Sequence, residues 1–377
     1  MLVVDDRENP LVGAPSLGAA PTALLEGFAQ LGHEQIEVHV VSCGKQRGVI
    51  ASKLAPNIWY HPLFVPSWAF LRTLHLGPAL AVRRLLREKI QPAIVHSQGI
   101  EWWCGLTGAL SGFPSVLTIH GNIRAILANS ILKPRAFWKL QALLGDFAIR
   151  RHSGVVCISE HVRRNITPRA RKTWLIPNAL RKRFLEGSGC VKKRRELPYL
   201  LVVGTITENK RPLELLDIFT SLHMAGYRFE VRFIGRLGSG DVYSNAFHSK
   251  LVAARRLGFV DHFDHFDEQA LIRHFDAADA LVHFPREEAF GLVVAEGLSR
   301  NLKLFASSIG GIVDIARGVP SVELFGGSDF IGLRSSIAKW LDSGSSRAIS
   351  SAELMRQRYA PIRVAEQTLG VYRELVA

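Results

Sequence analysis

Short apolar runs alternate with segments of helical periodicity along the whole chain, and this alternation restricts the possible folds more than any other feature of the sequence. Apolar strands that alternate with helices indicate parallel sheets covered by helices on both faces. The sequence therefore predicts an α/β protein built from doubly wound sheets. The expected strands lie at residues 2–4, 36–41, 93–96, 116–119, 155–158, 174–176, 199–203, 230–234, 280–284, 303–306 and 322–324.

The length of the chain sets the number of such sheets. With 377 residues the chain is long for one domain and suited to two of average size. A single (β/α)₈ barrel would be filled by about 250 residues, so two Rossmann-like domains are favoured. The segment 180–198 is charged, contains Gly-Ser-Gly and lacks apolar periodicity, which is typical of a linker. We expect one domain over residues 1–185 and a second over residues 186–360.

Cysteine spacing and hydropathy indicate the cellular compartment in which the chain is expected to work. The four cysteines have no paired spacing, which argues against a disulfide framework or a zinc motif and favours a reduced, cytoplasmic setting. The uncharged stretches 54–71 and 102–123 are interrupted by proline or glycine, so neither is expected to span a membrane. Charged residues at 5–8 interrupt the first apolar run, and we therefore expect no secretion signal.

The net charge of +14 is concentrated in one half of the chain. Residues 1–185 hold 23 basic and 10 acidic residues, whereas residues 186–377 hold 24 and 23. A basic half indicates an anionic partner. Nucleic acid is not favoured as that partner, because the basic residues do not interleave with stacking aromatics in a recognised module. The stretches 67–87 and 134–151 combine aromatics, leucines and arginines, which fits either helices packed on a sheet or helices on a membrane surface.

Ligands of open α/β sheets bind outside the carboxyl ends of the strands, so two such sheets predict an enzyme that binds a nucleotide-like molecule in a cleft. The most informative strand end is that of 280–284. A helix begins near Phe290 and Gly291, where free amides can bind an anion and glycine permits close backbone approach. Glu288 before the helix and Glu296 within it can accept hydrogen bonds from sugar or ribose hydroxyls.

These residues carry a family resemblance. The segment EAFGLVVAE (288–296) is similar to the E-P-F-G-L-x-x-x-E signature of the retaining glycosyltransferases of family 4, which have the GT-B fold of two facing Rossmann-like domains. Further motifs resemble the family's landmarks in the expected order and extend the resemblance over nearly the whole chain. They are LGHEQIEVHVVS (31–42), LTIHGN (117–122), VVCISEHVRRNI (155–166), IPNALRKRF (176–184), VGTITENKRPLELLDIF (203–219), AADALVHFP (277–285), IGGIVDIA (309–316) and VYREL (371–375).

The resemblance implies roles for residues of the donor site. Glu288 would bind hydroxyls of the donor sugar, and Glu296 would bind the ribose of the nucleotide. The backbone amides of Phe290, Gly291 and Leu292 would approach the sugar and its phosphates. The second domain would thus bind the nucleotide-sugar donor.

Two further residues are implied in catalysis. Lys210 would neutralise the diphosphate as the sugar–phosphate bond breaks. His120 would lie near the reacting sugar or the acceptor, which the first domain would bind. The helix at 361–377 would pack back towards that domain.

Two departures from the family pattern fall on phosphate contacts. The family commonly has an arginine where this chain has Thr205, and Arg211 or Arg236 could replace it. The family's N-terminal Gly-Gly loop is here reduced to Gly18. These departures keep open the alternative of an inactive homologue, and a GT-B sugar-nucleotide epimerase is a second alternative.

The function implied by the resemblance is transfer of a hexose, with retention of configuration, from a nucleotide-diphosphate sugar to a glycan or lipid-linked saccharide of the cell-surface polysaccharide or lipopolysaccharide type. No Asp-x-Asp motif occurs, so neither a metal nor another cofactor is expected. The His/Asp run at 261–275 has tempting metal spacing, but the family has a variable loop and helix there. The basic domain would attach the enzyme to the anionic cytoplasmic face of the cell membrane.

Overall fold

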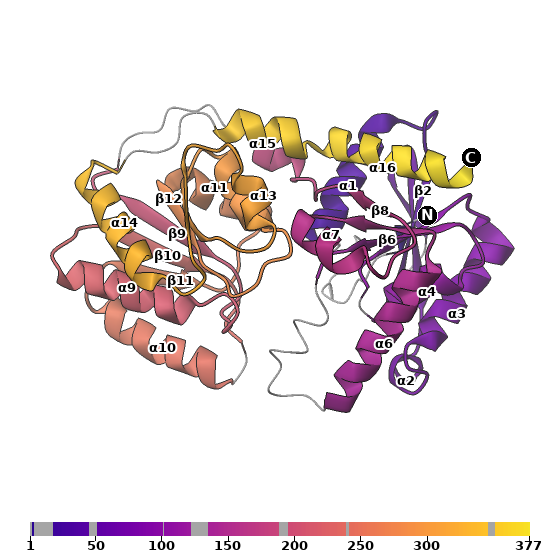
Figure 1. Cartoon of the computed structure of the whole chain (residues 1–377), viewed down its shortest axis with the longest axis horizontal. Helices are drawn as coiled ribbons and strands as arrows, with labels where there is room; N and C mark the ends of the chain where they lie inside the picture. The colour runs from indigo at the N-terminus through magenta and orange to yellow at the C-terminus, as the bar shows by residue number, and fades with distance from the viewer. Residues whose placement is uncertain are drawn as a thin grey trace. The chain divides into compact units, whose positions relative to one another are not determined.

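The computed structural model describes residues 2–3, 18–44, 51–100, 102–121, 135–187, 195–238, 241–345 and 351–377 (Figure 1). The chain divides into two compact units. The first unit comprises Met1–Lys182 together with Tyr359–Ala377, and the second comprises Arg183–Arg358. Residues 188–194 of the expected linker lie outside the described part of the chain.

The first unit contains an eight-stranded sheet with the order β3-β4-β2-β1-β5-β6-β7-β8. Every neighbouring pair is parallel except β3 and β4, which run antiparallel at one edge. Its strands are β1 (Leu2–Val3), β2 (Val38–Gly44), β3 (Ser52–Ala55), β4 (Ile58–Phe64), β5 (Val95–Gln98), β6 (Ser115–Ile119), β7 (Gly154–Cys157) and β8 (Thr173–Leu175).

Helices cover both faces of this sheet, because alternate residues of each strand point to opposite sides. Val38 and Val40 of β2 pack in a core with α1 and α16, whereas Val41 and Cys43 pack in a second core with α3 and α4. A Cβ at Gly27 of α1 would lie only 2.1 Å from a backbone oxygen at the start of α16, so this glycine allows the two helices to touch. The helices of the unit are α1 (Ala19–Leu31), α2 (Ser67–Leu71), α3 (Leu76–Leu85) with a π-helical turn (Leu86–Ile90), α4 (Trp102–Leu110), α6 (Arg135–Arg151), α7 (Glu160–Ile166) and α16 (Pro361–Val376).

The second unit contains a six-stranded, wholly parallel sheet with the order β11-β10-β9-β12-β13-β14. The strand order reverses at β9, which is where open α/β sheets bind ligands. Its strands are β9 (Tyr199–Val203), β10 (Glu230–Ile234), β11 (Val260–Phe263), β12 (Ala280–His283), β13 (Lys303–Ser307) and β14 (Val322–Phe325). Its helices are α8 (Lys182–Leu185, entering from the first unit), α9 (Pro212–Met224), α10 (Val242–Arg255), α11 (Glu268–Ala277), α12 (Leu292–Ser299), α13 (Ile312–Ala316), α14 (Phe330–Asp342) and α15 (Ser351–Tyr359).

Three strands were not expected from the sequence. β3 and β4 form an edge hairpin in which Pro62 lies beyond the pairs that β4 makes with β3, at a place where a missing amide proton is tolerated. β11 is an edge strand whose central residues, Asp261 and His262, are polar, and it occupies the start of the His/Asp run. Edge strands need only one apolar face, so their sequence signal is weak. No helix in the described residues is long and apolar enough to cross a bilayer.

Candidate active site

The loop between β12 and α12 in the second unit is shaped by glycines. Gly291 precedes α12 with φ of 101°, a left-handed conformation that glycine adopts without strain. A Cβ at Gly310 would lie 1.7 Å from the carbonyl oxygen of Glu288, and a Cβ at Gly311 would lie 2.5 Å from Cα of Phe290. The loop after β13 therefore packs directly against residues 288–290. This packing fixes the backbone at the amino end of α12, and the amino end of a helix favours an anion.

Glu288 in this loop is contacted by a lysine and a histidine side chain. Its Oε2 accepts hydrogen bonds from Nζ of Lys210 at 2.7 Å and from Nε2 of His283 at 3.0 Å. Burial alone would raise the pKa of the carboxyl group, but the hydrogen bond from His283 and the charge of Lys210 outweigh burial and lower that pKa to about 2. Glu288 is therefore ionised at neutral pH.

Asn209 clamps the loop before α9 to the loop before α12. Its side-chain Nδ2 donates to the carbonyl of Glu287, and its Oδ1 accepts from the amide of the same residue. Its own backbone carbonyl accepts from the amide of Arg286 at 2.7 Å. Three hydrogen bonds thus hold Lys210, the next residue, beside Glu288. Asn209 and His283 were not singled out in the sequence, because a loop asparagine and a histidine in an apolar strand carry no signal of their own.

The remaining residues expected in the donor site lie at the same end of the second sheet or on α12. Phe290 and Glu296 are buried, and Leu292 is half-buried at the first position of the helix. Thr205 is exposed on the loop that follows β9. Arg211 donates to the carbonyl of Gly327 and stacks on the ring of Phe330, so its guanidinium is already engaged.

Arg236 lies close to Thr205 in the fold. The loops after β9 and β10 touch, since a Cβ at Gly235 would be 1.9 Å from the carbonyl oxygen of Gly204. A parallel bridge between Ile206 and Leu237 continues this contact. Arg236 is exposed next to that bridge. Of the two arginines that could replace the missing guanidinium, Arg236 is the better placed.

His120 lies in the first unit, directly after β6. Its Nε2 is 2.8 Å from Oε1 of Gln98, whose Nε2 is 3.0 Å from Nε2 of the buried His96. The Nδ1 of His96 is 2.5 Å from the hydroxyl of Tyr372 on α16. Burial lowers the pKa of His120 to about 4, although a hydrogen bond with Asn178 opposes that effect. His120 is therefore neutral at pH 7 and belongs to a polar chain that reaches α16.

Gly18 is the last of the expected site residues. It is the exposed N-cap of α1 with φ of −54°, and a Cβ there would make an ordinary contact with Pro21. The backbone at this position does not require glycine. Residues 4–17, which include the rest of the expected N-terminal loop, lie outside the described residues.

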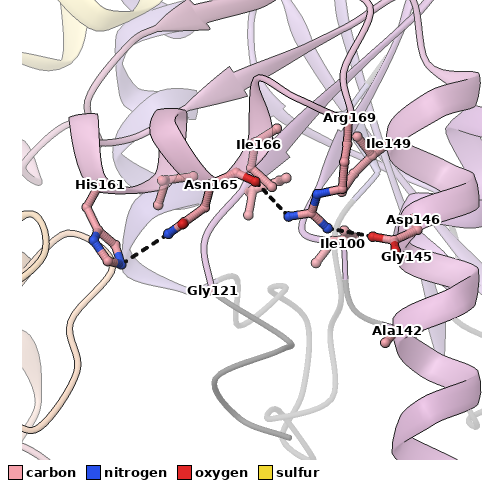
Figure 2. A pocket seen from close by; sticks show the side chains of 12 residues that line it. Ile100, Gly121, Ala142, Gly145, Asp146, Ile149, His161, Asn165, Ile166 and Arg169 are labelled. Atoms are coloured by element: carbon pink, nitrogen blue, oxygen red, sulfur yellow. Dashed lines mark hydrogen bonds and ion pairs between the residues drawn. The ribbon is translucent and has the colours of Figure 1, made fainter. Parts of the chain in front are cut away.

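A pocket open to solvent lies beside Ile119 and Gly121, the chain neighbours of His120, in the first unit. It lies between α6 and α7 at the carboxyl ends of β5 and β6, and Gly121 forms part of its wall (Figure 2). Most of its lining is aliphatic, from Ile100, Ile119, Ile149, Val162 and Ile166. An ion pair of 2.5 Å between Asp146 and Arg169 lines one side, as Figure 2 shows. The pocket suits a molecule with an aliphatic part and a polar end.

Metal ligands do not gather in the described parts of either unit. Among the described residues, no three His, Cys, Asp or Glu side chains are placed to hold a metal ion. The chemistry of the second unit's site instead combines one carboxylate, one lysine and the amides of a helix start, which suits a ligand with both hydroxyl groups and phosphate.

Family models match the two units of the chain separately. The model described as Glycosyltransferase Family 4 matches residues 22–181, and the model described as Glycosyl transferases group 1 matches residues 191–349. Together the two models span most of the chain. The chain belongs to the group 1 glycosyl transferases, as the resemblance of its signature motif predicted.

Solved structures show the fold. The chain is similar to sucrose-phosphate synthase from Thermosynechococcus elongatus, with a TM-score of 0.78, 18% identity and coverage of 99% of this chain and 98% of that one. It is also similar to Anabaena Alr3699/HepE in complex with UDP-glucose, with a TM-score of 0.68, 14% identity and coverage of 99% and 100%. These likenesses confirm the expected GT-B fold with two Rossmann-like domains.

Curated relatives match this chain over only part of their length. An uncharacterized glycosyltransferase of Methanocaldococcus jannaschii is 25% identical over 241 residues, which cover 60% of this chain and 61% of the relative. The phosphatidylinositol N-acetylglucosaminyltransferase GPI3 subunit of Saccharomyces cerevisiae is 23% identical over 313 residues, or 77% of this chain and 65% of the relative. The matched regions thus span less than two thirds of these relatives.

Proposed function

We propose that the chain transfers a hexose from a nucleotide-diphosphate sugar to a hydroxyl of a glycan or lipid-linked saccharide, with retention of anomeric configuration. The observation that carries the proposal is the ion pair between Lys210 and Glu288 beside the amino end of α12. It supplies a cation for phosphate and a carboxylate for sugar hydroxyls at one place. The Anabaena relative, whose structure holds UDP-glucose, supports a donor of this class.

Each part of the donor would meet a different group of the second unit. Glu288 accepts a hydrogen bond from a sugar hydroxyl, and Glu296 accepts one from the ribose. The amides of Phe290, Gly291 and Leu292 receive the phosphates, with Lys210 neutralising the leaving diphosphate. Arg236 adds the guanidinium that Thr205 lacks.

The reaction proceeds by front-face attack. The acceptor oxygen bonds to the anomeric carbon on the side from which the diphosphate leaves, and the bond from that carbon to the phosphate oxygen breaks. The acceptor proton passes to the leaving phosphate, so the products are the glycoside with unchanged configuration and the nucleoside diphosphate. This route needs neither a carboxylate nucleophile nor a metal ion, and we assign no cofactor.

The first unit would bind the acceptor. The pocket beside His120 accommodates its aliphatic part, and His120 lies next to the attacking hydroxyl. His120 is neutral at pH 7, so it adds no charge beside that hydroxyl. A lipid-linked saccharide has both features that the pocket suits.

The exterior of the first unit supports attachment to the anionic cytoplasmic face of a membrane. Trp68 and Leu80 on α2 and α3, and Leu143 and Phe147 on α6, are large apolar residues that are 59, 53, 66 and 45% exposed. The segments 67–90 and 135–151 together hold nine basic and two acidic residues. Apolar side chains flanked by arginines are typical of membrane-surface helices.

Binding to lipid vesicles tests this attachment. The purified protein should sediment with vesicles containing anionic lipid at low salt and be released by high salt. Neutral vesicles serve as the control. Equal binding to neutral and anionic vesicles, or binding to neither, would contradict the assignment.

Substitution of Glu288 tests the transferase. Glu288→Ala should abolish sugar transfer, because it removes the hydroxyl acceptor and leaves Lys210 and His283 without their shared partner. Glu353→Gln, which removes an exposed carboxylate from α15, is the matched control. Transfer that survives Glu288→Ala would overturn the mechanism, and conversion of the donor sugar in the absence of acceptor would identify an epimerase instead.

A further inference from the structure

His283 stands out among the residues of β12. It ends the strand, it is only 3% exposed, and the preceding Leu281 and Val282 and the following Phe284 are all fully buried and apolar. An imidazole at such a place loses its hydration, so its presence requires a specific hydrogen-bond partner. That partner is Glu288, five residues further along the chain.

Both donors to Glu288 use the same carboxylate oxygen. Lys210 and His283 each lie within hydrogen-bonding distance of Oε2. A carboxylate has about four acceptor positions on two oxygens, so Oε1 is left to accept from a ligand. The arrangement thus orients the carboxylate as well as stabilising its charge.

The two donors differ in mobility. The side chain of Lys210 is 26% exposed and has a flexible four-carbon stem, whereas the side chain of His283 is 4% exposed and carries a rigid ring. Lys210 is also the group that the proposed reaction requires for the diphosphate. A turn of Lys210 towards a bound diphosphate would leave His283 as the donor to Glu288.

The pKa of His283 lies below its ordinary value, which favours the neutral ring at pH 7. Burial lowers its pKa and the nearby Lys210 adds to that effect, while the hydrogen bond with Glu288 opposes both. An ionised carboxylate only accepts, so the neutral ring must carry its proton on Nε2. His283 therefore restrains Glu288 without adding a positive charge that would compete with Lys210 for phosphate.

We propose that His283 is a positioning residue that keeps Oε1 of Glu288 directed at the donor sugar while Lys210 exchanges the carboxylate for the diphosphate. This inference rests on the proposed function of the site. It differs from a purely structural role in one respect: it concerns recognition of the sugar and leaves recognition of the nucleotide unchanged.

Calorimetric binding of two probes, UDP and UDP-glucose, distinguishes these roles. His283→Leu should weaken UDP-glucose by about 10- to 100-fold, the effect expected when a hydrogen bond to a charged group is lost, and should leave UDP within about twofold of wild type. His283→Gln, whose amide can donate in place of Nε2, should restore most of the UDP-glucose affinity. His223→Leu is the matched control, because His223 lies near the far end of α9 from Lys210 and stacks on Phe259.

The possible outcomes distinguish failure of this inference from failure of the proposed function. Equal weakening of both probes by His283→Leu, or no rescue by His283→Gln, would overturn the positioning role while leaving the transferase intact. Failure of the wild-type protein to bind either probe or the corresponding GDP or ADP pair would overturn both. If His283→Leu does not fold, the test uses nitrogen-15 NMR on the wild-type protein and on His283→Gln. The wild-type spectra should show that Nε2 of His283 is protonated from pH 5 to 9. An unprotonated Nε2 would contradict the proposal.

Discussion

The carboxyl ends of the two sheets differ in how they present polar groups. In the second unit an ionised carboxylate is balanced by a lysine and a neutral imidazole, and the amides of α12 lie beside them. In the first unit the corresponding edge holds His120, Gln98 and His96 in an uncharged hydrogen-bonded chain, next to a largely aliphatic pocket. Under the proposed function, the charged groups of the second unit would face the leaving phosphate, and the uncharged chain of the first unit would face the attacking hydroxyl.

Removal of Lys210 from the second unit should have a large effect on kcat. Lys210→Ala should lower kcat by about 100- to 1000-fold, because a preorganised cation beside a developing negative charge contributes on this scale. Steady-state rates of transfer would measure it. Lys250→Ala is the control, since Lys250 makes an exposed ion pair with Asp217 on the same unit. Similar kcat values for the two variants would remove the charge assignment.

Filling the pocket of the first unit should affect the acceptor alone. Ala142→Trp places a large ring on the wall formed by α6 and should raise KM for the acceptor about tenfold or more, with the affinity for the donor unchanged. The control is Met224→Trp, at a position that is 72% exposed on α9. If Ala142→Trp altered donor affinity instead, the division of tasks between the units would be wrong.

Restoring the family's arginine should strengthen the donor site. Thr205→Arg should tighten binding of UDP about tenfold, the lower end of what a charge-assisted hydrogen bond contributes. Arg236→Ala should weaken UDP in the wild-type protein and have less effect once Thr205→Arg is present, because both supply the same contact. Calorimetry on the four proteins of this cycle measures the coupling. Additive effects would show that Arg236 does not replace the missing residue.

His120 and His152 should lose their contributions to stability in a different pH range from Glu288. Burial lowers the pKa of His120 and His152 to about 4, so folding is favoured above their unfolded value of 6.5 and loses that contribution as pH falls from 6.5 to 4. Glu288 has a pKa near 2, so its contribution is complete above 4.5 and is lost between 4.5 and 2. His152→Gln should therefore flatten the window from 6.5 to 4, and Glu288→Gln should flatten the window from 4.5 to 2. Urea unfolding at several pH values checks this, and identical profiles for the two variants would contradict it.

The fold was largely predictable because most of its inner strands are rich in apolar residues. The bounds expected for 199–203 and 230–234 are those of β9 and β10. The edge strands β3 and β11 gave too little apolar signal, and the prolines in 54–71 obscured β4. The apolar pattern of a strand is clearest where both of its faces are buried.

The candidate site was predictable only in part. The sequence placed Glu288 after a strand and Lys210 before a helix, but their hydrogen bond joins residues 78 positions apart and is a product of the strand order. His283 was hidden inside an apolar strand, and the pocket between α6 and α7 arises from packing that no single segment encodes. Contacts of this kind follow from tertiary structure rather than from spacing.

In the proposed function, the second unit binds a nucleotide-diphosphate sugar through Glu288. Saturation-transfer NMR against a panel of UDP-, GDP- and ADP-sugars tests it most directly, with wild type and Glu288→Ala compared side by side. We predict that one nucleotide series binds the wild-type protein with transfer to both sugar and ribose protons, and that Glu288→Ala loses the sugar signals first. Absence of binding by every member of the panel, or sugar signals that are equal in both proteins, would contradict the account.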